Sequence, residues 1–242
     1  MILADDSPLN RIPPLQDTVL VQLLDGVRYS IGMADLSYQR LESSMERVFE
    51  PEPQVNRICV EAFLDAWSFV DAVNRLRNLL EVTVRKRVIP QVRVFIGETE
   101  TYKDLRNDVQ HLETELRKKK RAEVEKAKAD GEDEAPPWML GMPATWGTLA
   151  CLGPTSDASK AKFAVLVPGT RSYATSNFGI ASAPYPVRPA DSITLTAHGK
   201  QVRLTTTHRA IERVTRAIEA VLPPGTHPGH AEFLLVGTTP YE

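Results

Sequence analysis

The sequence predicts a mainly α-helical protein, an up-and-down four-helix bundle with a small antiparallel β-sheet inserted before the last helix. Three observations predict this class. Apolar residues recur at steps of three or four along most of the chain up to residue 128. Short runs rich in Thr, Val and Phe, bordered by Gly or Pro, follow Pro137. The helical step then returns at Thr207 and stops at Pro223 and Pro224. The predicted divisions are a helical core (15–134), a β insertion (138–206), a fourth helix (207–223) and a tail (224–242) in which HAEFLLVG is compatible with a last strand.

Composition narrows the class of protein further. The chain has 242 residues, of which 42% are hydrophobic and 25% charged, enough for one core or one core with a small annex. Cys59 and Cys151 lie far apart and form no metal or redox pattern. The start of the chain lacks the basic and apolar regions of a signal peptide, and no apolar run approaches the roughly 20 residues of a membrane span. We therefore expect a cytoplasmic protein without membrane contact. A net charge of -2 argues against a protein coated in nucleic acid but permits a local basic patch.

The first helical stretch runs from Leu20 to Val48. Its apolar residues mark one long helix or two pieces, with Gly26 and Gly32 as the weak points. Residues 18–31 are also compatible with a β-hairpin that turns at Asp25 and Gly26.

A second helix is predicted from about Val55 to Lys86, because a broad apolar stripe extends from Val60 to Leu80 and Pro90 lies just beyond. The segment VRVFIGETET that follows is ambiguous. Glu98 or Thr99 can open the third helix.

The third helix contains the segment KDLRNDVQHLETELRKKKR, residues 103–121. At about 100° per residue, four apolar side chains share the face of the helix that points to a core, namely Leu105, Val109, Leu112 and Leu116. The same angles direct Arg106, Asn107 and His111 away from the core. The helix is expected to continue through RKKKRAEVEKAKA and to stop in DGEDEAPP.

The insertion is predicted to contain four short strands that form a small antiparallel sheet and do not enter the bundle core. His198 and Gly199 give a hairpin signal between the last two strands. The predicted strands cover 148–152, 163–167, 193–197 and 201–205.

The motif RNDVQH on the third helix resembles the R-x4-6-H motif of the HEPN superfamily, whose catalytic members are metal-independent ribonucleases built on a helical bundle. Arg106, Asn107 and His111 stand in the matching places. The resemblance covers residues 20–128 and 207–222 and gives no account of the sheet. It implies RNA as substrate, no cofactor, and a symmetric homodimer in which the motif helices of two subunits share each site. It also implies a role in toxin–antitoxin or phage-defence systems, with an antitoxin or another protein as partner.

The chemistry of such a site explains these residue types. A histidine with a pKa near neutrality can take the proton from the 2'-hydroxyl of RNA, which assigns this step to His111. The guanidinium of Arg106 matches phosphate oxygens and would stabilise their growing charge. Asn107 lies four residues before His111, where it can orient the ring or bind the phosphate. The alternative is a non-catalytic dimeric scaffold or protein-interaction module in which these residues are a solvated helix face.

A basic run follows the motif, and four of its residues are candidates for contacts to the RNA backbone: Lys118, Lys119, Lys120 and Arg121. Acidic residues follow at helical spacing, so the run is also compatible with a solvated helix.

Four other features have a functional and a structural interpretation each. Asp65, Asp71 and Arg75 on the second helix either support the site or form a salt bridge at the edge of the core. His227 and His230 lack a third metal ligand nearby, so no metal site is predicted. Trp138 and Trp146 either pack on the sheet or stack on bases. The pair Arg203 and His208 has the spacing of the motif by chance, because it crosses a predicted strand-to-helix boundary.

Overall fold

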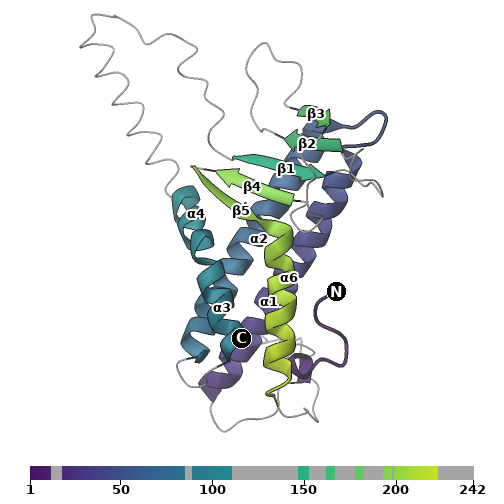
Figure 1. Ribbon diagram of the computed structural model, residues 1–242. Coiled ribbons are helices and arrows are strands. Elements are labelled where there is room, and N and C mark those ends of the chain that lie inside the picture. The colour runs from purple at the N-terminus through teal and green to yellow at the C-terminus, as the bar shows by residue number, and fades with distance from the viewer. Residues whose placement is uncertain are drawn as a thin grey trace, which may run out of the picture.

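Two long antiparallel helices form the centre of the computed structural model (Figure 1). They are α1 (Thr18–Arg47) and α2 (Val55–Val84). Ion pairs join Arg47 to Glu61 and Arg40 to Asp65 across the two helices, so residue numbers rise on one as they fall on the other. The structure describes residues 1–11, 18–84, 89–110, 147–152, 162–166, 178–182, 193–197 and 199–222.

Residues 18–31 belong to the single continuous helix α1, so the hairpin alternative is wrong. Gly26 has a packing role instead of a turn role. A Cβ atom at this position would lie 3.1 Å from Cδ1 of Leu79 on α2. The glycine therefore lets the two helices approach closely where a larger residue would push Leu79 aside.

The ambiguous segment before the third helix forms a helix of its own, α3 (Pro90–Glu98). The predicted third helix follows as α4 (Glu100–Gln110), within two residues of its predicted start, so the structure describes more helices than the four that were predicted. Thr99 lies between them, fully buried, and its hydroxyl donates to the carbonyl of Phe95 at 2.7 Å. The buried Arg77 of α2 supports the junction, because its guanidinium bonds Glu100 at 2.9 Å and approaches the carbonyl of Ile96 at 3.4 Å. Contacts of Thr99 and Arg77 thus support the junction between α3 and α4, in a segment where the spacing of apolar residues is ambiguous. The predicted continuation beyond residue 110 lies outside the described residues.

The sheet is antiparallel and has the strand order β3-β2-β1-β4-β5. Four strands agree with the prediction to within two residues, and β3 was not predicted. The hairpin at Gly199 is confirmed, since this residue has φ 74° and β4 pairs antiparallel with β5. The strands are β1 (Thr148–Leu152), β2 (Lys162–Leu166), β3 (Phe178–Ser182), β4 (Ile193–Ala197) and β5 (Lys200–Arg203).

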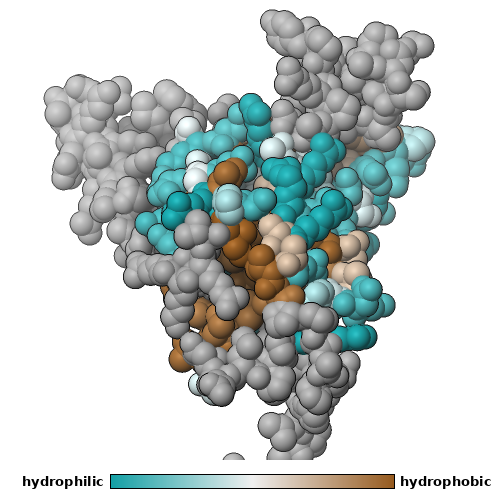
Figure 2. Space-filling view, turned by 60° about the horizontal axis from the view of Figure 1, so that its bottom comes forward, coloured by the Kyte–Doolittle hydropathy of each residue, from teal (hydrophilic) through white to brown (hydrophobic). Residues whose placement is uncertain are grey.

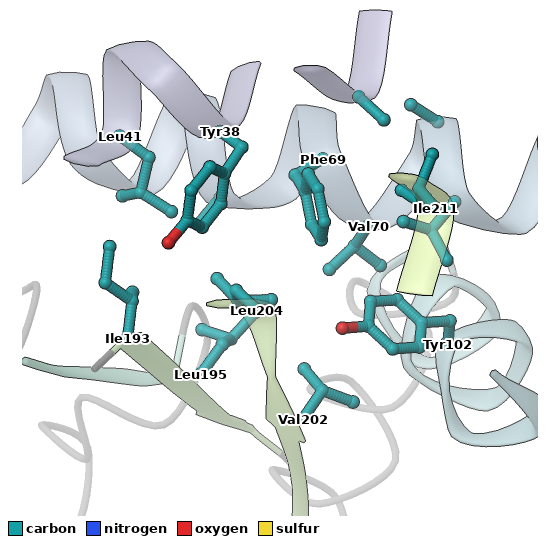
Figure 3. Close-up of a cluster of buried hydrophobic side chains, with 14 of the residues drawn as sticks. Tyr38, Leu41, Phe69, Val70, Tyr102, Ile193, Leu195, Val202, Leu204 and Ile211 are labelled. Carbon is teal, nitrogen blue, oxygen red and sulfur yellow. The ribbon is translucent and has the colours of Figure 1, made fainter. Parts of the chain in front are cut away.

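The expectation that the strands stay out of the bundle core is wrong. Alternate residues of β4 are buried, and they share one hydrophobic core with the helices. Figure 3 shows Ile193, Leu195 and Val202 of the sheet pointing toward Tyr38 of α1 and Tyr102 of α4. A sheet with one apolar face needs a cover for it, and the helices provide that cover.

The last described helix, α6 (Leu204–Glu219), begins directly after β5. Two buried tyrosines attach its first turn to the other helices. Tyr38 donates to the hydroxyl of Thr205 at 2.9 Å, and Tyr102 donates to that of Thr207 at 2.8 Å. The helix therefore starts three residues earlier than the apolar period predicts.

The first residues of the chain also pack on this core. A short 3-10 turn, η1 (Pro8–Arg11), follows residues that lie against α1, and the side chains of Leu3 and Leu9 are buried. Among the helices that the structure describes, none is both long and apolar enough to span a membrane.

Candidate active site

The structure places two of the three predicted catalytic residues. Arg106 and Asn107 lie in the last described turn of α4, and Leu105 beside them is fully buried. Asn107 is exposed and Arg106 is partly exposed, so the predicted direction of these side chains is confirmed. His111 lies outside the described residues, as do Lys118, Lys119, Lys120 and Arg121.

Arg106 is held by a carboxylate of the neighbouring helix. Its Nε atom donates to Oδ1 of Asp71 on α2 at 2.7 Å. The other oxygen of Asp71, Oδ2, accepts from Nε of Arg75 at 2.6 Å. The predicted salt bridge of Asp71 and Arg75 is therefore present, and it also reaches the candidate site.

The charges of this cluster do not cancel. Two guanidinium groups and one carboxylate leave one net positive charge at neutral pH. Burial raises the pKa of Asp71, but the hydrogen bonds from Arg106 and Arg75 outweigh burial and hold that pKa below its ordinary value. The side chain of Arg106 is 30% exposed and that of Asp71 is 37% exposed. The cluster is thus an oriented, positively charged group with access to solvent.

Three further contacts fix the helix that carries Arg106. The phenol ring of Tyr102 is buried and bonds α6 as described above. Glu100 pairs with the buried Arg77 of α2. Asp104 lies 3.7 Å from the ammonium group of Lys200 on β5, which attaches α4 to the edge of the sheet. The position of α4 is therefore determined by α2, α6 and the sheet together.

Asp65 belongs to a different part of α2. Its carboxylate is buried and lies 3.2 Å from Nε of Arg40 on α1. Burial raises the pKa of Asp65, and the nearby Glu61 adds to this effect, while Arg40 lowers it. Asp65 thus bridges the two long helices and does not contact Arg106.

A second polar cluster was not predicted. It contains His208, the histidine of the second pair with the spacing of the motif. Arg203 ends β5 and His208 lies on α6, so the predicted boundary between them is confirmed. Nε2 of His208 lies 2.8 Å from Oδ1 of the buried Asp35 on α1, and its ring stacks on that of Tyr38 at 4.1 Å between centroids. The other oxygen of Asp35 accepts from the backbone N–H of Ile2 at 2.8 Å. This cluster joins α1, α6 and the start of the chain.

The sequence contains a signal for the inward direction of His208. The residue lies four positions after Leu204 and three before Ile211, which are both fully buried. A side chain at this spacing points to the same side of the helix as its apolar neighbours. A polar residue there needs a buried partner, and Asp35 is that partner.

The described residues contain no group of three His, Cys, Asp or Glu side chains arranged to hold a metal ion. The histidines at 227 and 230 lie outside them. Comparison with known proteins gives no significant match, neither to a family model nor to a curated protein nor to a solved structure. The assignment of function therefore depends on the residues of this chain alone.

Proposed function

We propose that this protein is a metal-independent endoribonuclease of the HEPN type, with a bundle of that kind, and that Arg106, Asn107 and His111 are its catalytic residues. The observation that supports the proposal most directly is how the guanidinium of Arg106 is bonded. Its Nε is engaged by Asp71, and among the described residues no other acceptor bonds its guanidinium. The terminal amino groups of an arginine held in this way can bind two oxygens of a phosphate.

The proposed reaction uses the substrate's own nucleophile. His111 takes the proton of the 2'-hydroxyl, the 2'-oxygen forms a bond to phosphorus, and the bond from phosphorus to the 5'-oxygen breaks. The leaving 5'-oxygen takes a proton from water. The products carry a 2',3'-cyclic phosphate and a free 5'-hydroxyl. Arg106 stabilises the charge that grows on the phosphate oxygens, and Asn107 orients the ring of His111 or the phosphate.

The resemblance further suggests that the site is shared by two subunits. The exposed position of Asn107 and the partial exposure of Arg106 support this, because such residues are available to a second copy of α4. One observation favours the alternative of a non-catalytic scaffold. The bond between Arg106 and Asp71 is also what a purely structural ion pair between two helices would form.

Cleavage of single-stranded and structured RNA by the purified chain separates the two functions. We expect cleavage at neutral pH in the presence of EDTA, with 2',3'-cyclic phosphate or 3'-phosphate ends. His111→Ala and Arg106→Ala should each lower the rate on the order of a hundredfold or more. Arg203→Ala is the matched control, since it removes an exposed arginine from β5 and should leave the rate unchanged.

Absence of cleavage by the well-folded chain would favour the scaffold function. Activity that survives His111→Ala but disappears with EDTA would contradict the proposed mechanism.

A further inference from the structure

An apolar groove of about 290 Å³ lies between α3 and α6. Val94 and Phe95 line it on α3, and Ala210 and Val214 line it on α6. The side chain of Val94 is 57% exposed. Figure 2 shows hydrophobic side chains gathered in one hollowed patch on the face that includes the lower ends of the helices in Figure 1. A patch of this kind on a monomer commonly marks a contact surface.

The size and edge of the groove indicate what it accepts. Its volume lies at the lower limit of pockets for small molecules, and it suits a few aliphatic side chains of a peptide segment. Glu98 and Arg213 flank it as a loose pair at 4.0 Å, and both are more than half exposed. Arg213 can therefore receive a carboxylate from a bound segment with little rearrangement.

Residues 223–242 of the same chain contain a segment with matching chemistry. Its run of four apolar residues, Phe233 to Val236, is preceded by Glu232. An apolar run of this length among Pro, Gly, Thr and His gains free energy when it is buried. The carboxylate of Glu232 complements Arg213 at the edge of the groove.

The tail also starts close enough to reach the groove. The structure describes α6 and the turn after it up to Leu222, eight residues after Val214 and about 12 Å further along at 1.5 Å per residue. The ten residues between Leu222 and Phe233 can span about 35 Å. The helix α6 ends at Glu219, and the sequence Pro223, Pro224 and Gly225 disfavours a further helix after it. Because the tether is covalent, binding is intramolecular and its effective concentration is high.

We infer that the groove between α3 and α6 is the binding surface for the chain's own segment from Glu232 to Val236. The apolar side chains of the segment fill the groove beside Val94, and Glu232 pairs with Arg213. This binding attaches the tail to α3 and so reinforces the position of α3 relative to α6.

Hydrogen–deuterium exchange of the full chain, followed by mass spectrometry, tests the inference. We expect the amides of residues 233–237 to exchange at least tenfold more slowly than in an unstructured peptide. Val94→Lys should return them to the unstructured rate. Val60→Lys is the matched control, because Val60 is a 70% exposed valine near the start of α2, far along the helix from the segment that leads to α3. This control should leave the exchange unchanged.

A reciprocal variant keeps the test informative if Val94→Lys fails to fold. Leu235→Asp changes only the tail, and we expect it to abolish protection of the tail and to accelerate exchange along Pro90–Glu98. Unprotected tail amides in the unchanged protein would refute the inference, as would protection that neither variant alters. Sedimentation velocity tests whether a second copy of the chain occupies the groove instead of the tail. If Val94→Lys dissociates a dimer, the groove binds a second copy and the inference is wrong.

Discussion

Replacement of Asp71 by Asn separates a structural role of the Arg106 cluster from a role in positioning a catalytic group. The two oxygens of Asp71 accept from different arginines, Oδ1 from Arg106 and Oδ2 from Arg75. An amide of the same shape can accept from only one of them, and its NH2 group then faces the other guanidinium. The substitution therefore loosens Arg106 without leaving a cavity.

The expected loss of stability is small. A partly exposed ion pair such as that of Arg106 and Asp71 contributes about 0.5–1 kcal/mol, and the helical pair of Arg75 with Asp71 contributes about 0.3–0.5 kcal/mol. We expect Asp71→Asn to lower the free energy of unfolding by about 1 kcal/mol. For a chain of this length, the corresponding decrease in Tm is about 2–4 °C.

The expected effect on RNA cleavage is larger than the effect on stability. A mobile Arg106 loses part of its stabilisation of the transition state, so kcat should fall about tenfold. Removal of the carboxylate also adds one net positive charge to the cluster, so KM for RNA should fall at low salt. A purely structural ion pair predicts the same change in Tm with kcat unchanged. That result would refute the positioning role of Asp71.

The matched control is Asp65→Asn, made six residues earlier on the same helix. Asp65 pairs with Arg40 and does not contact Arg106. Because burial raises the pKa of Asp65, its charged form is less favourable in the folded chain than in the unfolded one. We expect Asp65→Asn to leave both kcat and KM unchanged, with stability equal to or above that of the original protein. Loss of cleavage in this variant would show that disturbance of α2, rather than of Arg106, determines activity.

Two further predictions concern stability and assembly. His208→Ala removes the ring that bonds one oxygen of the buried Asp35 and leaves that oxygen without this partner. The loss should cost about 2–4 kcal/mol in urea unfolding, with kcat for RNA unchanged in the folded protein. Burial raises the pKa of Asp35, but hydrogen bonds from His208 and Ile2 outweigh burial and lower it. The stabilisation of the fold by the Asp35 carboxylate is therefore complete above the pKa of Asp35 in the unfolded chain, and it is lost as pH falls through its pKa in the folded chain. Between pH 6 and 2, the free energy of unfolding should consequently fall less in His208→Ala than in the original protein. Light scattering at tens of micromolar should give the mass of a homodimer, and a well-folded monomer would contradict the shared site.

The helical elements were predictable because their apolar period is long. Thirty residues of α1 and thirty of α2 repeat the step of three or four, and this repetition outweighs single weak positions such as Gly26. The hairpin at Gly199 was predictable because a glycine between two short β-rich runs is typical of a tight turn, and the structure gives this glycine the positive φ that such a turn needs. Both features depend on neighbours in the sequence.

The features that were missed depend on contacts between distant residues. The ambiguous segment before Thr99 is the helix α3, and its junction with α4 is bonded by Arg77, which lies 22 positions before Thr99 on another helix. The first turn of α6 is fixed by two tyrosines from α1 and α4. The covered face of the sheet could have been inferred, because alternate residues of ITLTA in β4 are apolar and a one-sided apolar sheet needs a partner layer. The third candidate catalytic residue, His111, lies outside the described residues together with the basic run that follows it, so the placement of these side chains stays a prediction.

The contacts of α4 limit how a second subunit could approach the proposed site. Seen along its axis, the helix directs Leu105 to the core, Arg106 to α2 and Asp104 to the edge of the sheet. At about 100° per residue, Lys103 and Asn107 occupy the remaining side, opposite Leu105, and both are exposed. A symmetric dimer that joins two copies of this helix therefore has to form across the side of Lys103 and Asn107. If RNA binds between two copies as proposed, it would meet Asn107 before it meets Arg106. On that proposal Asn107 would contact the phosphate and Arg106 would reach it from the edge of the interface.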